Sequence, residues 1–155
     1  MLVAHQEPPA LRALGTYSPL CDEYGVDFLW LAHGTWTGCQ RKEVKDLGAS
    51  LRDGRVADLL VKANQIGRAV LLVEGDFQWG PSGESRVVRG FTRAQWHGLE
   101  MGIQQLGIWI VRTDSLEETA DTLPRLEQWF SKAAHDSLFR EPRNPAPAGE
   151  RLWQA

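Results

Sequence analysis

The chain has 155 residues, of which 43% are hydrophobic and 24% charged, and its formal net charge at pH 7 is −3. This length is typical of one domain, and the apolar fraction is too high for a disordered chain. The acidic balance excludes a broadly cationic nucleic-acid-binding protein, so a nucleic-acid partner must contact a local basic patch.

Signals for export or membrane insertion are not predicted. No apolar run approaches the ~20 residues of a membrane span, and polar residues follow the first four too soon for a secretory signal peptide. Cys21 and Cys39 supply neither a disulfide framework nor a four-ligand zinc site. We expect both to be small buried hydrophobes of a reduced, cytoplasmic protein.

The first half of the chain predicts strands followed by helices. Strand-forming residues dominate its early segments, and apolar residues then recur three and four apart, which is typical of amphipathic helices. In chain order the predicted elements are a brief strand at 1–5, a turn at 21–25, a β-hairpin of strands 26–32 and 36–42, and helices at 43–52 and 55–66.

The second half predicts an alternation of strand and helix. Near-continuous apolar runs indicate strands buried on both faces, and cap residues mark the helix starts. The predicted elements are a buried strand at 69–74, a long loop or exposed hairpin at 75–90, a helix at 93–106 capped by Thr92, a strand at 108–111, and a helix from the Ser115 capping box to about His135, kinked or broken at Pro124. This alternation predicts an α/β sandwich around a mixed sheet. The predicted domain spans residues 1–138, and the proline- and charge-rich residues 139–155 predict a flexible tail.

Candidate catalytic residues flank the predicted hairpin. Asp27 begins one strand, and a hairpin brings it opposite the end of the next, where Gln40, Arg41 and Lys42 lie. At a period of two, Gln40 and Lys42 project to one face and Arg41 to the other. A carboxylate, an amide oxygen and a lysine at one sheet edge suit phosphodiester hydrolysis with a divalent metal ion. The lysine would orient or deprotonate the attacking water and offset developing negative charge.

These residues resemble the signature of the XPF-type structure-specific endonucleases, a branch of the PD-(D/E)XK superfamily. That signature is Gly-Asp, a variable spacer, Glu-Arg-Lys, three residues and Asp; the chain has Val26-Asp27, Gln40-Arg41-Lys42 and Asp46. The resemblance covers residues 1 to about 135. It continues through LGASLRDGR at 47–55, LLVEG at 71–75 and TDSLEET at 113–119.

The resemblance implies a restriction-endonuclease-like three-layer sandwich, with a central mixed β-sheet flanked by helices. It also implies a Mg²⁺- or Mn²⁺-dependent endonuclease that cuts branched DNA (flaps, forks or Holliday junctions) in repair, recombination or phage DNA processing. Stand-alone phage and bacterial members resemble the form with glutamine at the position of Gln40. The family's nuclease domain dimerises through its later helices, and Leu126, Trp129 and Phe130 suit such a surface.

The chain departs from the family pattern at several positions. Residues 4–7 are Ala-His-Gln-Glu where the family has Asp-x-Arg-Glu, Val26 replaces the glycine, and Gln40 replaces the catalytic glutamate. An amide oxygen binds a cation but supplies no charge, so a carboxylate from Glu7, Asp46 or Glu74 is a candidate replacement. The predicted metal ligands are therefore Asp27, Gln40, Glu7 and Asp46, with the Arg41 carbonyl as a possible addition.

The predicted DNA contacts come from basic residues around this site. They lie on two helices and on the long loop, where Trp79 is also placed to stack on an unpaired base. Arg41 acts either on a phosphate or in a structural ion pair. The predicted DNA-binding residues are Arg41, Lys45, Arg52, Arg55, Arg86 and Arg89.

Two other functions remain open from the sequence. In the first, the fold is kept but the chemistry is lost through Ala4 and Gln40, which leaves a pseudonuclease that serves as a DNA-binding or partner-binding subunit. In the second, the chain is an interaction module without DNA, and Asp27 and Lys42 are incidental. Failure to bind DNA at low salt, where phosphate contacts are strongest, would favour the second.

Overall fold

The structure is a computed structural model that describes residues 1–132. Its elements are β1 (Leu2–Val3), α1 (Pro9–Arg12), β2 (Thr16–Tyr17), α2 (Pro19–Tyr24), β3 (Phe28–Ala32), β4 (Thr35–Glu43), α3 (Val44–Arg52), α4 (Arg55–Asn64), β5 (Gly67–Glu74), α5 (Arg93–Gln105), β6 (Trp109–Thr113) and α6 (Leu116–Ser131). The tail expected at 139–155, and the end of the last helix expected near His135, lie outside the described residues. The domain boundary therefore stays a prediction.

A mixed six-stranded sheet, in the order β2-β1-β3-β4-β5-β6, forms the centre of the fold. β3 and β4 pair as the predicted antiparallel hairpin, while β4, β5 and β6 run parallel. The hairpin turns at His33 and Gly34, which both have positive φ, as a tight turn between twisted strands requires. β5 lies between two neighbours and is buried from Ala69 to Glu74, which explains its apolar run.

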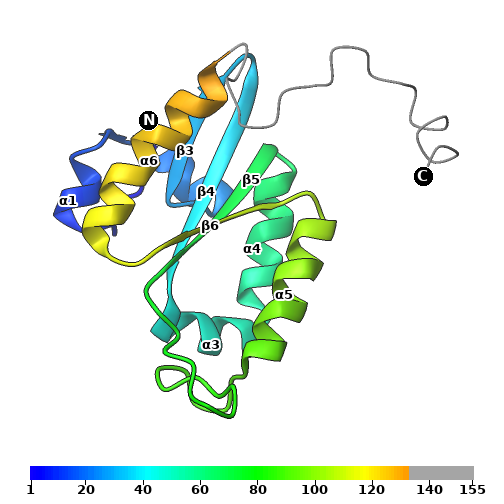
Figure 1. Ribbon diagram of the computed structural model, residues 1–155. Helices are drawn as coiled ribbons and strands as arrows, with labels where there is room; N and C mark the ends of the chain where they lie inside the picture. The colour runs from blue at the N-terminus through cyan, green and yellow to red at the C-terminus, as the bar shows by residue number, and fades with distance from the viewer. Residues whose placement is uncertain (133–155) are drawn as a thin grey trace, which may run out of the picture.

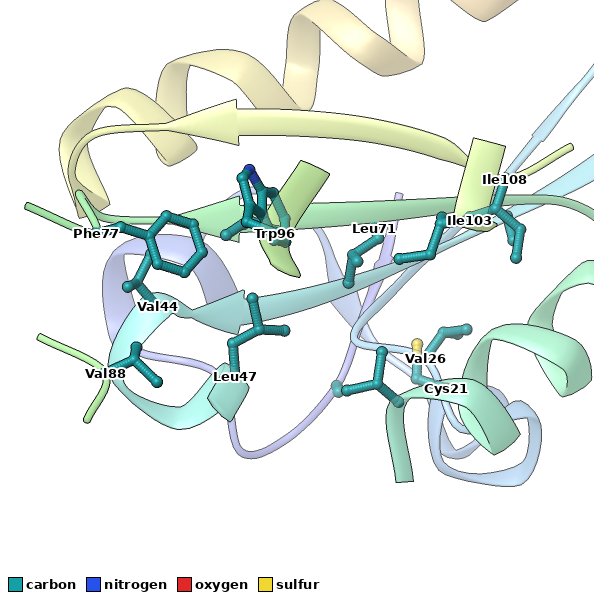
Figure 2. Close-up of a cluster of buried hydrophobic side chains, with 14 of the residues drawn as sticks. Cys21, Val26, Val44, Leu47, Leu71, Phe77, Val88, Trp96, Ile103 and Ile108 are labelled. Carbon is teal, nitrogen blue, oxygen red and sulfur yellow. The ribbon is translucent and has the colours of Figure 1, made fainter. Parts of the chain in front are cut away.

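Helices cover both faces of this sheet, so the predicted three-layer sandwich is confirmed (Figure 1). One core lies between the sheet and α3, α4 and α5; Figure 2 shows Leu71 of β5 among Leu47, Trp96 and Ile103 from the helical layer. The other core lies beneath α1 and α6, where buried side chains of β3, β4 and β5 meet Leu11, Leu123 and Phe130. Within residues 1–132, no helix combines the length and apolar character needed to cross a membrane.

The segment before β3 differs from its prediction. The expected turn at 21–25 is the end of the helix α2, and α1 and β2 were not predicted. Ser18 caps α2 by accepting a hydrogen bond from the Leu20 N–H (3.2 Å), and Gly25 ends it at φ 67°. A proline at the first helical position and a glycine at the end suffice for this six-residue helix. Its Cys21 is buried and, like Cys39, unpaired.

Two other segments are more ordered than their sequences predict. The loop between β5 and α5 packs Phe77 and Val88 into the first core, and a Cβ at Gly48 of α3 would lie 2.4 Å from the Val88 side chain. α6 runs through Pro124 as one helix, so of the kink or break predicted there, the break is wrong and the kink stays a prediction. A proline removes one backbone hydrogen bond, and buried residues on both sides of it, Thr119 and Phe130 among them, hold the helix on the sheet.

Candidate active site

Asp27 and Gln40 face each other across the open end of the hairpin. The Asp27 N–H donates to the Cys39 carbonyl (2.9 Å), and the pairing of Phe28 with Cys39 places Asp27 opposite Gln40. The Asp27 carboxylate is 5% exposed. Its Oδ2 accepts from the Arg41 N–H (2.8 Å), and its Oδ1 accepts from Gln6 Nε2 (3.4 Å). The hairpin therefore fixes the position of this carboxylate.

Gln40 has a buried oxygen without a partner. The side chain is 7% exposed, and within residues 1–132 its Oε1 accepts no hydrogen bond. Leaving a buried acceptor unsatisfied costs roughly 1–3 kcal/mol. Gln40 and Asp27 line one pocket of about 250 Å³. A carboxylate beside an unsatisfied amide oxygen is a hard-oxygen donor set, so the residues present fit Mg²⁺ or Mn²⁺.

Arg41 lies on the opposite face of β4, as the strand period predicts, and is clamped by two carboxylates. Its Nε and Nη2 donate to Glu74 at 3.0 and 2.7 Å, and its Nη1 donates to Glu7 at 3.3 Å. Only 10% of the Arg41 side chain is exposed. Of the two roles left open by the sequence, these contacts favour the structural ion pair over a phosphate contact.

Glu74 also connects this ion pair to α6. Thr119 Oγ1 donates to Glu74 Oε2 at 2.6 Å, and Thr113 Oγ1 lies 2.6 Å from Thr119 Oγ1. Because the Thr119 proton is used on Glu74, Thr113 is the donor in the second bond. Both threonines are buried. Sequence reasoning did not assign them a role, because a threonine without its partners carries no signal of its own.

Asp27, Glu7 and Glu74 form a cluster of three carboxylates around Arg41, and their pKa values are shifted in different directions from the ordinary ones. Burial, followed by the nearby charge of Asp27, raises the pKa of Glu7 to about 7. Burial also raises the pKa of Asp27, although the Arg41 N–H, Glu7 and the charge of Lys42 oppose it. Burial alone would raise the pKa of Glu74, but the hydrogen bonds from Arg41 and Thr119 outweigh it and lower the pKa. Near pH 7, Glu7 therefore holds a proton part of the time.

The other predicted metal and catalytic residues are Lys42 at the end of β4 and Asp46 on α3. Lys42 is half-buried at the end of β4, and its charge acts on Asp27. Asp46 is exposed in the first turn of α3, where the helix dipole stabilises a carboxylate. Within residues 1–132, no three His, Cys, Asp or Glu side chains converge on a metal position. A cation here therefore depends on the Gln40 amide and on oxygens from water or substrate.

Apart from Arg41 on β4, the predicted DNA-binding residues occupy α3, α4 and the loop before α5. Lys45 is exposed and lies 3.9 Å from Glu43. Arg52 Nη2 donates to the Arg89 carbonyl at 2.9 Å, which joins α3 to the loop, and Arg86 and Arg89 are exposed on that loop. Arg55 begins α4.

Aromatic residues predicted to contact DNA or a second subunit are partly used inside the fold. Trp79 stacks on Phe77, with ring centres 4.7 Å apart. Phe130 is buried against Trp30, whereas Trp129 on the same helix is 42% exposed. Of the three aromatic residues with predicted contacts, Trp79, Trp129 and Phe130, only Trp129 is a largely exposed side chain.

Comparison with known proteins finds one matching family and solved structures with a similar fold. Residues 5–126 match the family described as the ERCC4 domain. Among solved structures, XPF from Aeropyrum pernix is 19% identical with a TM-score of 0.57, and the match covers 99% of this chain and 71% of that one. The same protein in complex with DNA is 19% identical with a TM-score of 0.55, covering 86% and 63%. At this identity the two structures show a shared fold, and no curated protein sequence matches the chain.

Proposed function

The chain belongs to the ERCC4 domain family, a family of structure-specific DNA endonucleases, and on that premise we propose that it hydrolyses phosphodiester bonds in branched DNA with Mg²⁺ or Mn²⁺. Membership confirms the resemblance to XPF-type nucleases noted in the sequence. One observation carries the proposal: the buried, unpartnered Gln40 oxygen lies beside Asp27 in one pocket. An unsatisfied oxygen at this position lowers the stability of the fold, whereas a bound cation would use it as a ligand.

In this proposal each residue around the pocket has a chemical role. Asp27 and the Gln40 amide oxygen hold the cation, and the Arg41 backbone carbonyl is a further ligand. A bound divalent cation supplies Lewis-acid polarisation of the scissile phosphate. Lys42 orients the attacking water. The water oxygen bonds to phosphorus as the bond to the leaving oxygen breaks; the proton released by the water passes to solvent, and the leaving oxygen takes a proton from solvent.

The remaining roles concern DNA and a second subunit. Lys45, Arg52, Arg55, Arg86 and Arg89 contact the phosphate backbone. The XPF structure with DNA shows that the related protein binds DNA. We propose that the present chain also binds DNA, and that it acts inside the cell in repair or recombination. A homodimer formed through the C-terminal helices would use the exposed Trp129 of α6.

The deciding experiment measures cleavage of labelled duplex, splayed, flap and four-way DNA by wild type and Lys42→Ala. Lys62→Ala, an exposed lysine on α4, is the matched control. We expect branched DNA to be cut with Mg²⁺ or Mn²⁺ and not with EDTA. Cleavage should fall roughly 10²- to 10⁴-fold in the Lys42 variant, the usual contribution of a group that assists proton transfer. Lys62→Ala should cut like wild type.

A pseudonuclease remains the second candidate, because Ala4 and Gln40 each replace a carboxylate of the family pattern. If wild type and both variants bind DNA but none cuts it with either metal, the enzyme proposal fails and this candidate replaces it. Gln40→Glu then discriminates further, since one added carboxylate does little for a site that lacks others.

A further inference from the structure

The proposed cation pocket is short of negative charge. A protein site for Mg²⁺ ordinarily supplies one or two carboxylates, with water and substrate phosphate completing the shell. Asp27 is the one carboxylate so far assigned to the pocket. Glu74 lies on the other face of the sheet in bidentate contact with Arg41, and Glu7 is also engaged by Arg41. Gln40 brings an oxygen without a charge.

A carboxylate outside the family pattern lines the same pocket. Asp22 lies on α2, whose C-terminus is closed by two backbone hydrogen bonds just before β3: Gly25 N–H to the Asp22 carbonyl (3.2 Å) and Val26 N–H to the Cys21 carbonyl (2.9 Å). These bonds reverse the chain at Gly25, and Asp22 and Asp27 then line the same pocket. The pocket is lined by Asp22, Asp27, Gln40, Gln6, Cys21, Gly25 and Val26.

Asp22 is also available to bind. Its side chain is exposed, and within residues 1–132 it makes no hydrogen bond or ion pair. The other nearby candidate, the Cys21 thiol, is a poor ligand at neutral pH because burial raises its pKa to about 11. Glu23, the next residue of α2, is exposed but does not line the pocket.

We propose that Asp22 supplies the second carboxylate of the divalent-cation site, opposite Asp27 and the unpartnered Gln40 oxygen. The inference rests on the proposed function. The negative charge that the family pattern places at residue 40 has then moved across the pocket to α2, while the Gln40 amide keeps its oxygen directed at the cation. A donor set of two carboxylates and one amide oxygen meets the usual preference of Mg²⁺ and Mn²⁺.

The test is direct binding of Mn²⁺ to the full chain in the absence of DNA, followed by the electron paramagnetic resonance signal of free Mn²⁺. We compare wild type, Asp22→Asn, Asp27→Asn and Glu23→Gln. Glu23→Gln removes the same charge from the same helix and is the matched control. Asp22→Asn should raise the dissociation constant by at least roughly 10- to 100-fold, the loss that removal of even an outer-shell partner of a metal ligand commonly causes. Glu23→Gln should leave it unchanged.

A second variant tests whether the charges act on one cation. Gln40→Glu restores a carboxylate on the other side of the pocket. The double variant with Asp22→Asn and Gln40→Glu should therefore recover most of the Mn²⁺ affinity that Asp22→Asn alone loses. Circular dichroism of each variant verifies the fold.

The outcomes separate this inference from the proposed function. If Asp22→Asn binds Mn²⁺ like wild type, or weakens binding only as much as Glu23→Gln does, the role of Asp22 is refuted, while a site at Asp27 and Gln40 stands. If wild type shows no saturable binding and Asp27→Asn behaves identically, the metal site fails, and the proposed metal-dependent function fails with it.

Discussion

Two carboxylates share the Arg41 guanidinium, yet their pKa values move in opposite directions. Glu74 receives two hydrogen bonds from Arg41 and one from Thr119, which stabilise its charged form. Glu7 receives one longer bond of 3.3 Å and faces the charge of Asp27. A cation at Asp27 would offset this repulsion, so cation binding and the Glu7 proton compete.

Glu7→Gln should flatten the pH dependence of stability. The folded-state pKa of Glu7 is raised from the ordinary 4.5 to about 7, so the stability it contributes is complete below pH 4.5 and is lost as the pH rises through about 7. At about 1.36 kcal/mol per pKa unit, the wild-type free energy of unfolding should decline by up to roughly 3 kcal/mol over this range relative to the variant. Urea unfolding in EDTA from pH 4.5 to just above 7 measures the difference.

Glu23→Gln is the control for this measurement, because Glu23 is an exposed carboxylate outside the cluster. Its unfolding free energy should follow that of wild type at every pH. Parallel curves for Glu7→Gln and wild type would contradict the assignment of the raised pKa to Glu7.

At the scale of elements, the buried Glu74 connects β5, β4 and α6. It is the last residue of β5, its partner Arg41 belongs to β4, and its partner Thr119 belongs to the second turn of α6. Removing one partner of a buried ion pair costs more than the pair itself contributes, because the remaining charge loses its compensation. Without Glu74, Arg41 would keep only its longer contact of 3.3 Å with Glu7.

Glu74→Gln should therefore lower the free energy of unfolding by roughly 3–5 kcal/mol. Thr119→Val, which keeps the shape of the side chain, should cost about 1–3 kcal/mol, and Thr119→Ser should recover most of that loss. The Glu74 pKa is lowered in the folded state, so its contribution is present above the ordinary pKa of 4.5 and is lost as the pH falls through the lowered value. Urea unfolding at neutral and acidic pH should show the gap between wild type and Glu74→Gln narrowing in acid. A gap that stays constant in acid would contradict a charged Glu74.

Elements with strong periodic or capping signals were predicted well. The hairpin, α3, α4, β5, α5 and β6 agree with their predicted ranges to within a few residues, because apolar spacing and glycine breaks are local features. α2 was missed because its six residues are too short for a helical period, and its signals lie only in Ser18-Pro19 and Gly25. Of the kink or break predicted at Pro124, the break did not occur because tertiary packing on the sheet outweighs one lost hydrogen bond.

The parts of the site that depend on local patterns were likewise predictable, whereas its long-range contacts were not. The pairing of Asp27 with Gln40 follows from the hairpin, and the opposite direction of Arg41 follows from the strand period. The contacts of Arg41 with Glu7 and Glu74 join residues that are 34 and 33 positions apart in the sequence, and local patterns do not predict such contacts. Asp22 enters the pocket only because α2 turns back at Gly25, so a missed helix concealed a candidate ligand.

For the whole molecule, the net charge of −3 means that attraction to DNA must be local. The contact between Arg52 and the Arg89 carbonyl joins the basic residues of α3 to those of the loop. The loop itself is anchored, since Phe77 and Val88 are buried and Ser85 Oγ donates to the Phe77 carbonyl at 2.6 Å. The exposed arginines therefore lie on a loop whose backbone is already held by packing. DNA binding then costs little conformational entropy for ordering this loop.

Replacing Arg86 and Arg89 together by alanine should weaken DNA binding by a measurable, salt-dependent amount. Each phosphate contact releases condensed counterions, so losing two contacts should reduce the slope of log K against log salt by roughly 1.8 on duplex DNA. Fluorescence anisotropy with a labelled duplex over a salt series, in EDTA to prevent cleavage, gives the slope. Arg125→Ala on α6, an exposed arginine in the opposite helical layer, should leave it unchanged. Equal slopes for all three proteins would place the DNA away from the loop, whereas equal reductions would mean that only the net charge of the molecule matters.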